Sequence, residues 1–336
     1  MRVVVMEDYQ RAVEGLRCFS AILADTSHTV VVHAKRPADR AERAAQVGNA
    51  EALVLIRERT PIDGLLLDLL PGLRLICQTG KGTPHIDIDA CTRRGIVVCT
   101  GPGSPFAPAE LTLALILASS RLLVEDAVAL RAGSWQTTIG TELNGRTLGV
   151  VGYGTIGALV ARYGRALGMH VLAWGQSGSF ARARADDCVV EPDLEELFGR
   201  ADVVSLHLKL SPATRGIITS KHLAAMKSSA LLVNTARAAL IEQGALDRAL
   251  AAGRPGRAAI DVFDEEPATN DPLLRHATVL ATPHLGYVTR ETYESYFTGV
   301  FAQIEAFAAG TPRDVLNPEA LAVALNLLGG GTASGG

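Results

Sequence analysis

The sequence predicts an α/β protein with two doubly wound parallel sheets. Short apolar runs alternate with helical patterns along most of the chain, and this order gives parallel strands connected by helices. A length of 336 residues exceeds what one hydrophobic core usually organises, so two domains are expected. A glycine-rich turn, VVGYGTIG, follows an apolar run and opens a helix. We therefore expect Rossmann-like domains.

The first half of the chain predicts one such sheet. Strands are expected at 2–7, 29–34, 52–57, 73–78 and 95–100, and helices near 8–23, 36–47 and 62–69. Residues 102–133 then predict one long helix with a proline-marked entry, ending near Gly133. Its apolar content exceeds what one amphipathic face needs, so we expect it to pack against two partners, either both domains or a second subunit.

A second series of strands begins at residue 148. Its further strands are expected at 171–175, 202–208, 230–236, 258–263 and 278–283. These are runs of the parallel type, buried on both faces. A helix at 296–310 follows, and residues 329–336, which lack apolar content, should form a flexible tail.

The composition is globular and argues against several classes of partner. Hydrophobic residues make up 48% of the chain and charged residues 20%, with a formal net charge of −3. A chain without a basic field is not expected to bind nucleic acid. Too few apolar residues precede Glu7 for a signal peptide, and the longest apolar run is too short to span a membrane. We expect a soluble, cytoplasmic protein.

The spacing of the cysteines does not indicate a disulfide framework or a structural metal site. They are odd in number, scattered and never spaced as CxxC (Cys18, Cys77, Cys91, Cys99 and Cys188). Because metal sites need closely spaced ligands, we interpret the cysteines as small buried hydrophobic residues and expect no metal site.

The glycine-rich turn has the spacing that binds a dinucleotide. Gly152, Gly154 and Gly157 fit GxGxxG between a strand and a helix. The first permits the tight turn, the second lets the backbone approach a pyrophosphate, and the third allows close packing of helix on strand. With Thr155 and Ile156 they form the amino terminus of the helix, which favours an anion. The alternative is a plain structural turn.

The end of the next strand leaves the choice of coenzyme open. An acidic residue that binds the ribose of NAD normally stands about twenty residues after the glycines. This chain has Gly175 and Gln176 there, followed by Ser177, Arg182 and Arg184. Without the acid a 2′-phosphate is not repelled and an arginine could accommodate it, although both arginines could equally be solvated on a helix. The coenzyme is therefore NAD or NADP.

Charged side chains are expected at three strand ends. Arg237 follows the strand at 230–236 and His284 follows the strand at 278–283. Asp261 lies at the end of the strand between them in the chain, and Glu266 follows five residues later. Adjacent parallel strands lie about 4.8 Å apart and end at one edge of a sheet, so neighbouring strands would bring these residues to one pocket.

This set suits hydride transfer to a 2-keto acid. The substrate carboxylate and carbonyl need forked donors, which Arg237 offers. The alkoxide formed at C2 must gain a proton, which the imidazole of His284 can donate near neutral pH. A neighbouring carboxylate, for which Glu266 is the candidate, would favour the protonated ring. Singly, each residue could instead be a helix cap, a histidine satisfied by its turn, or a surface carboxylate.

Together the motifs resemble those of the D-2-hydroxyacid dehydrogenases from about residue 50 to Pro318. The resemblance is carried by TGKGTPHIDIDACTRRGIVV, PAELTLALILASSR, LNGRTLGVVGYGTIG, DVVSLHLKLSPATRG, LLVNTARAALIEQGAL, AAIDVFDEEP and TPHLGY. It implies a flavodoxin-like substrate domain, residues 1–104 and 290–328, and an inserted dinucleotide-binding domain, residues 105–289. The active site would lie in the cleft, and members commonly form homodimers through the long helix after PAEL.

The resemblance also implies catalytic roles. Arg237, Glu266 and His284 match the family's catalytic arginine, glutamate and histidine, with His284 as the general acid and base. Asp261 would lie by the nicotinamide. His284 would also contact the coenzyme there.

Further binding residues follow from the same resemblance. Thr235 and Ala236 would contact the coenzyme. Backbone amides around Gly80, Lys81 and Gly82 would hold the substrate carboxylate, together with the catalytic arginine.

Several positions depart from the family pattern. Ala238 replaces the glycine that follows the catalytic arginine, and Lys209 replaces a proline after its strand. Lys81 and His85 stand where many members have small or apolar residues, and Tyr287 stands where a small residue is usual. Tyr287 could narrow the pocket, while Lys81 either adds a cation near the substrate carboxylate or is solvated.

The leading hypothesis is a reductase of a small 2-keto acid, in the manner of glyoxylate or hydroxypyruvate reductases. A phosphoglycerate dehydrogenase is the nearest alternative, although the chain ends without room for the regulatory domain that many of those carry. A formate dehydrogenase fits less well, because that branch of the family lacks the carboxylate partner that Glu266 supplies here. From another class, a dinucleotide-sensing scaffold like the family's corepressors stays open. Arg57, Arg59 and Lys81 hint at an anionic substrate tail, but surface charge is the favoured interpretation.

Overall fold

The computed structural model describes residues 1–24 and 27–329 and divides into two compact units. Unit 1 combines Met1–Gly103 with the segment from Thr289 onward, and unit 2 is Ser104–Val288. Apart from Gly329, the tail predicted at 329–336 lies outside the described residues.

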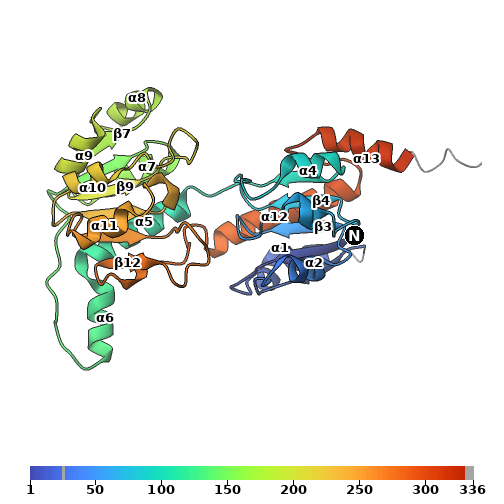
Figure 1. Cartoon of the computed structure of the whole chain (residues 1–336), viewed down its shortest axis with the longest axis horizontal. Helices are drawn as coiled ribbons and strands as arrows, with labels where there is room; N and C mark the ends of the chain where they lie inside the picture. Colours follow the sequence, from blue (N-terminus) through green and yellow to red (C-terminus); the bar gives the residue numbers. More distant parts are fainter. Residues whose placement is uncertain (25–26, 330–336) are drawn as a thin grey trace, which may run out of the picture. The chain divides into compact units, whose positions relative to one another are not determined.

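Unit 1 has a five-stranded sheet, parallel throughout, in the order β2-β1-β3-β4-β5 (Figure 1). Its strands are β1 (Arg2–Met6), β2 (Thr29–Val32), β3 (Ala52–Leu55), β4 (Leu75–Gln78) and β5 (Val97–Thr100). All five fall within the predicted ranges. The central strands β3 and β4 are buried along their whole length, as apolar runs between helical layers are.

The carboxyl-terminal segment completes unit 1. Its helices are α1 (Arg17–Ala24), α2 (Arg40–Val47), α3 (Gly64–Leu67), α4 (Ile88–Arg93), α12 (Arg290–Ala308) and α13 (Glu319–Gly329), with the 3-10 helix η1 (Val13–Gly15). Helix α12 buries Phe297, Val300 and Ile304 and packs against α1 and β4. The last helices of the chain therefore lie in the same unit as the first strands.

The helix predicted at 8–23 begins later, at Arg17. The carboxylate of Asp8 accepts a hydrogen bond from the N–H of Val13 at 2.9 Å. Leu16 is extended, with φ −79° and ψ 145°, and separates η1 from α1. The prediction was wrong here because a side-chain bond to the backbone stabilises a turn in place of the first helical turns.

Unit 2 has a seven-stranded parallel sheet in the order β12-β11-β10-β9-β6-β7-β8. The strands are β6 (Thr147–Val151), β7 (His170–Trp174), β8 (Val189–Val190), β9 (Val203–Leu206), β10 (Leu231–Asn234), β11 (Arg257–Ile260) and β12 (Val279–Ala281). Only the two-residue β8 was not predicted. Strands β10, β11 and β12 are neighbours, so the three strand ends singled out above share one edge of the sheet.

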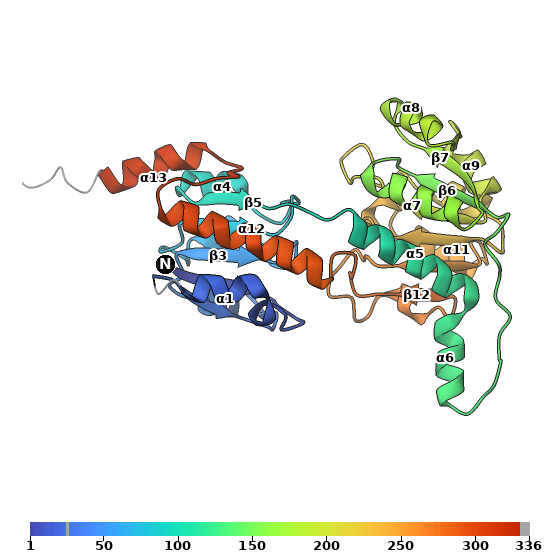
Figure 2. The same ribbon diagram turned by 180° about the vertical axis from the view of Figure 1, so that it is seen from behind.

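Helices cover both faces of this sheet. They are α5 (Phe106–Arg121), α6 (Leu123–Arg131), α7 (Thr155–Ala166), α8 (Ser177–Ala185), α9 (Leu194–Arg200), α10 (Ser220–Ala225) and α11 (Ala245–Ala251), with 3-10 helices η2 (Ala238–Leu240) and η3 (Pro272–Arg275). Helices α9, α10 and α11 bury their apolar side chains in one core, and α5 and α7 in another. Figures 1 and 2 show the helices packed along the sheet. The sheet is doubly wound, as predicted.

The long helix predicted over 102–133 is broken in two. Leu122 has φ 53° and ψ 38°, the left-handed conformation that ends a helix, and it separates α5 from α6. The carbonyl oxygen of Ser120 accepts a hydrogen bond from the N–H of Thr141 at 2.7 Å, which a continuous helix would not leave available. Helix α6 then extends away from the rest of unit 2 (Figures 1 and 2).

Four of the five cysteines are buried and Cys18 is half-buried, all as free thiols. Burial raises the pKa of the Cys91 thiol to about 12, as expected of an inert core residue. Over the described ranges, 1–24 and 27–329, no helix combines the length and apolar character that a membrane span requires. Among the same residues, no three His, Cys, Asp or Glu side chains are grouped so as to hold a metal ion.

Candidate active site

Two glycines of the glycine-rich turn are required by its geometry. Gly152 has a φ of +102°, and a Cβ there would lie 2.7 Å from backbone atoms of His207 and Leu208. A Cβ at Gly157 would lie 2.1 Å from the carbonyl oxygen of Gly152. The turn is therefore held closely against the segment after β9 and against the first turn of α7.

Gly154 differs, because a Cβ there would face open space. It is the N-cap residue of α7, and its helix has no side-chain cap. The first backbone N–H groups of α7 can therefore bind an anion. A cavity of about 640 Å³ lies at this point, lined by Gly154, Thr155 and the arginines Arg162, Arg165 and Arg182. Positive charge beside an uncapped helix amino terminus fits the pyrophosphate of a dinucleotide.

The end of β7 carries no acid of the kind that many dinucleotide-binding domains place there. A Cβ at Gly175 would lie 2.5 Å from Oγ of Ser179. Arg182, on α8, donates from Nη2 to the carbonyl oxygen of Tyr153 at 3.0 Å, so its guanidinium contacts the glycine turn. A cation therefore takes the place of the acid beside the turn.

The other residues predicted at this strand end do not make a comparable contact with the glycine-rich turn among the described residues. Gln176 is the exposed N-cap residue of α8. Helix α8 begins at Ser177, whose side chain lies outside the described part of the structure. Arg184 is exposed on the same helix.

Asp261 is fully buried just past β11 and holds the loop that carries the histidine. Its Oδ1 accepts hydrogen bonds from the hydroxyl of Thr282 at 2.7 Å and from the N–H of Leu285 at 2.6 Å. Its Oδ2 accepts from the N–H of Gly286 at 2.8 Å. Burial raises the pKa of Asp261, and these donors and His284 oppose the rise. This loop-holding contact was not indicated by the sequence.

His284 and Glu266 are in direct contact. Nδ1 of His284 lies 2.6 Å from Oε2 of Glu266, whose Oε1 accepts a hydrogen bond from the N–H of Phe263 at 3.0 Å. The His284 side chain is 20% exposed and that of Glu266 35%, so the ring can meet a ligand while the carboxylate orients it. The ring of Tyr287 packs edge-on against the imidazole at 5.4 Å between centroids. Because Nδ1 is engaged, Nε2 is the nitrogen suited to exchange a proton with a ligand.

Arg237 lies three residues past β10, the strand beside β11. Its Nη1 donates to the carbonyl oxygen of Ala236 at 2.7 Å. The hydroxyl of Thr235 is 2.7 Å from that of Thr112 on α5. Ala238 opens η2, so this position does not need the conformational freedom of glycine.

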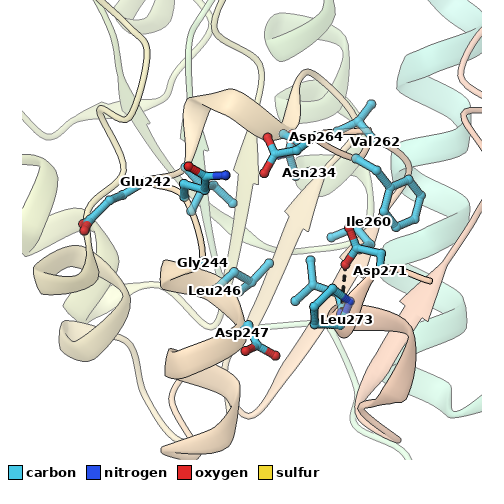
Figure 3. A pocket seen from close by; sticks show the side chains of 15 residues that line it. Asn234, Glu242, Gly244, Leu246, Asp247, Ile260, Val262, Asp264, Asp271 and Leu273 are labelled. Carbon is cyan, nitrogen blue, oxygen red and sulfur yellow. Dashed lines mark hydrogen bonds between the residues drawn. The ribbon is translucent and has the colours of Figure 1, made fainter. Parts of the chain in front are cut away.

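A second cavity, of about 260 Å³, lies beside the same strand ends. Figure 3 shows Asn234, Ile260 and Val262 in its wall, together with Asp271, whose side chain caps η3. The cavity therefore borders the ends of β10 and β11, from which the segments that carry Arg237 and Glu266 continue.

In unit 1, the loop after β4 packs on two charged side chains. A Cβ at Gly80 would lie 2.1 Å from Nη1 of Arg57, and one at Gly82 would lie 2.4 Å from Oε1 of Glu58. The Arg57 and Glu58 side chains form an ion pair at 3.4 Å and are 15% and 17% exposed. Gln78, fully buried, donates to the carbonyl oxygen of Gly82 at 2.9 Å. The favoured interpretation of Arg57 as a surface charge is wrong, because it packs beneath this loop.

Arg59 is likewise engaged inside unit 1. It donates to the carbonyl oxygen of Glu7 at 2.6 Å and to the hydroxyl of Tyr293 at 3.1 Å. Lys81, by contrast, is exposed. Burial lowers the pKa of His85, in the same loop, to about 4.

The sequence interpretation missed Arg162 and Arg165, which line the larger cavity. Both lie on α7, where residues 158, 162 and 165 recur at helical spacing on the face that lines the cavity. That spacing, directly after a glycine-rich turn, was the signal that could have identified them.

The comparisons with known proteins point to one family. Residues 113–286 match the family model for the D-isomer specific 2-hydroxyacid dehydrogenase, NAD binding domain. The matched range includes the glycine-rich turn and the three strand ends with Arg237, Glu266 and His284.

Curated relatives differ in how much of their length the chain spans. It is 39% identical over 276 residues to a D-3-phosphoglycerate dehydrogenase of Mycobacterium leprae. The aligned region covers 81% of this chain but only 52% of that protein. It is 38% identical over 288 residues to a glyoxylate reductase of Aeropyrum pernix, covering 82% of this chain and 85% of that protein. The chain therefore spans about half the length of the phosphoglycerate dehydrogenase.

A solved structure is similar over nearly the whole chain. It is a protein of Ralstonia solanacearum that bears a provisional name, D-3-phosphoglycerate dehydrogenase oxidoreductase. The TM-score is 0.93 and the sequence identity 47%, over 96% of this chain and 99% of that one.

Proposed function

Because the chain belongs to the D-isomer specific 2-hydroxyacid dehydrogenase family, we propose that it reduces a small 2-keto acid to the D-2-hydroxy acid with NAD(P)H. The observation that carries this proposal is the contact of 2.6 Å between Nδ1 of His284 and Oε2 of Glu266. It lies at the sheet edge where the segments after β10 and β11 carry Arg237 and Asp261.

Each of these side chains has a distinct task. The coenzyme, when bound, supplies the hydride. His284 donates a proton from Nε2 to the substrate oxygen during reduction and removes it in the reverse direction. Glu266 orients the ring through Nδ1 and stabilises its protonated form. Arg237 binds the substrate with parallel N–H donors, and Asp261 holds the loop beneath the imidazole.

The substrate carboxylate is assigned to backbone N–H groups around Gly80, Lys81 and Gly82. In support, Gly80 has a φ of +77°, a conformation that strains any residue with a side chain, and a Cβ at Gly82 would displace the carboxylate of Glu58. A loop with bare peptide groups at both positions can bring its N–H donors close to an anion.

A screen of keto acids against both reduced coenzymes tests the proposal. Glyoxylate, pyruvate, hydroxypyruvate and 3-phosphohydroxypyruvate cover the short and the phosphorylated members of the class. We expect steady coenzyme oxidation with at least one short 2-keto acid and a product of D configuration. Tight coenzyme binding without turnover on any of them would reject the enzyme and favour a dinucleotide-sensing scaffold.

A phosphoglycerate dehydrogenase is the second candidate function. The names of the M. leprae and R. solanacearum proteins favour it. The same screen separates the two candidates, because this alternative requires kcat/KM for 3-phosphohydroxypyruvate to exceed that for glyoxylate and hydroxypyruvate.

The choice of coenzyme is expected to depend on Arg182. Its guanidinium contacts the glycine turn at Tyr153, and the site has no acid at Gly175 to repel a 2′-phosphate. Removing one charged hydrogen bond costs about 1.5–3 kcal/mol, so Arg182→Ala should lower kcat/KM for NADPH by about 10- to 100-fold. The value for NADH should fall by a smaller factor, because NADH carries the pyrophosphate but lacks the 2′-phosphate. Steady-state kinetics with each coenzyme measure both values.

Arg184→Ala is the matched control, since it removes the same charge from α8, but Arg184 does not line the cavity that Arg182 lines. It should leave both coenzymes nearly unaffected. Equal losses for NADH and NADPH in Arg182→Ala would show that Arg182 supports the glycine turn and does not select the coenzyme.

We also propose that the protein is a homodimer joined through α6 and the loop after it. Helix α6 buries no residue. Its large apolar side chains and those of the following loop are exposed by 46–94% (Leu123, Val124, Val128, Leu130, Trp135 and Ile139). Several exposed apolar side chains on one helix and the loop after it are typical of an interface, and the same side chains of a second copy would cover them.

Leu130→Glu should therefore weaken dimerisation. Burying a leucine stabilises by about 1.5–3 kcal/mol and the side chain occurs twice in a symmetric dimer, so Kd should rise by at least about 100-fold. Sedimentation equilibrium at micromolar concentration measures this. Val189→Glu is the control, because Val189 is similarly exposed, at 58%, but lies on the edge strand β8. A wild-type protein that is already monomeric would refute the proposal.

A further inference from the structure

Asn234 is the last residue of β10 and is held by the sheet on both sides. It pairs with Leu206 of β9 and Ile260 of β11 in the parallel register. Its carbonyl oxygen accepts a hydrogen bond from the N–H of Asp261 at 3.0 Å, and the residue is 1% exposed. Its backbone therefore has little freedom to move.

The side chain of Asn234 ties the following segment to this fixed point. Its Oδ1 accepts a hydrogen bond from the N–H of Ala236 at 3.0 Å, and its Nδ2 donates to the carbonyl oxygen of Arg237 at 2.9 Å. Residues 235–237 belong to no helix or strand, since β10 ends before them and η2 begins after them. One amide thus closes this short loop onto the end of the sheet, with its donor and its acceptor both in use.

We infer that Asn234 is a positioning residue that fixes the place from which Arg237 reaches the substrate. This inference rests on the proposed function, in which Arg237 binds the keto acid. A planar guanidinium makes parallel hydrogen bonds only in a narrow geometry, and a displacement of about 1 Å can lower a rate by roughly 100-fold. The N–H of Leu240 also reaches the carbonyl oxygen of Arg237, but at a longer 3.3 Å.

An amide is needed at position 234 because the two contacts are of opposite kind. Aspartate has nearly the same shape and accepts the N–H of Ala236, yet as a carboxylate it cannot donate to Arg237. A serine hydroxyl can also accept the N–H of Ala236, but its side chain is shorter than that of asparagine and does not reach the carbonyl oxygen of Arg237 as the amide does. Asn234 also borders the cavity of about 260 Å³ in Figure 3, so it is not enclosed by packed atoms on every side and an isosteric replacement should fold.

A double-mutant cycle between Asn234→Asp and Arg237→Ala tests the inference. With Arg237 present, N234D should lower kcat/KM by at least about 10-fold. In the R237A background it should cost less than about threefold, because no guanidinium is left to misplace. Coenzyme Kd, measured by fluorescence titration, should change much less than kcat/KM. If N234D does not fold, Asn234→Ser carries the same test.

Asn317 provides a matched control. It is 2% exposed, its Oδ1 accepts the N–H of Val98 at 2.7 Å, and its Nδ2 donates to the carbonyl oxygen of Ile96 at 3.0 Å. N317D therefore makes the same chemical change in the same kind of backbone clamp, but in unit 1. It should lower Tm, as N234D does, while kcat/KM measured well below Tm stays within about twofold of wild type.

The possible outcomes separate the inference from the proposed function. The positioning role would be overturned if N234D lowered kcat/KM by the same factor with and without Arg237. It would also be overturned if the coenzyme Kd rose by as much as kcat/KM fell. In both cases Arg237 would keep its proposed role in binding the substrate. An unchanged kcat/KM in R237A alone, with Asn234 intact, would instead reject the proposed function of Arg237 and the inference with it.

Discussion

His284→Ala should lower kcat for keto-acid reduction by roughly 10²- to 10⁴-fold, because the substrate oxygen then lacks its proton donor. Coenzyme binding should persist. The imidazole contacts Glu266 and the ring of Tyr287, whereas the proposed pyrophosphate site lies at the amino terminus of α7. Steady-state kinetics with the best keto acid of the screen measure the first effect, and fluorescence titration with the reduced coenzyme measures the second.

A second histidine of unit 2 serves as the control. Nε2 of His276 lies 2.7 Å from Oδ1 of Asp247, so this residue also pairs with a carboxylate, but His276 precedes β12 whereas His284 follows it. His276→Ala removes an equivalent pair and should leave kcat within about twofold of wild type. If His284→Ala retained the wild-type kcat, or if both variants lost activity equally, proton donation by His284 would be refuted.

The sheets could be predicted because their strands carry a local signal. β10 reads LLVN and is buried along its whole length, so its apolar run marks a central strand wherever it lies. The alternation of strands and helices then predicts parallel order, and polar residues after β10, β11 and β12 are expected at one edge. The contact between His284 and Glu266 depends on this edge, which is why it could be anticipated from residues 18 positions apart.

Features without a local signal could not be predicted. Leu122 adopts a left-handed conformation that leucine rarely takes, and the break it causes accompanies a hydrogen bond from Thr141, which lies 21 residues beyond Ser120. Arg57 looks like a surface charge in the sequence, but the folded unit places it beneath the loop of Gly80. In each case the deciding partner is distant in the chain or hidden until the tertiary structure forms.

Arg237→Ala should lower kcat and raise KM for the keto acid together, because the guanidinium binds the substrate in the ground state and binds it more strongly during hydride transfer. Each charged hydrogen bond contributes about 1.5–3 kcal/mol, so loss of two should reduce kcat/KM by about 10²- to 10⁴-fold. Arg237→Lys should recover only part of this loss, since an ammonium group keeps the charge but not the parallel donors. Steady-state kinetics over a range of keto-acid concentrations separate the effects on kcat and KM.

Arg254 offers a control of the same side-chain type. Its Nη1 donates to the carbonyl oxygen of Met226 at 3.2 Å, a contact to backbone like that between Arg237 and Ala236, but at the opposite end of β11. Arg254→Ala should therefore leave kcat/KM within about threefold of wild type. Full activity in Arg237→Lys would show that charge alone suffices, and the case for forked recognition of the substrate would fail. A defect in KM alone would show that Arg237 binds the substrate and the transition state equally, because losing an interaction that strengthens in the transition state lowers kcat as well.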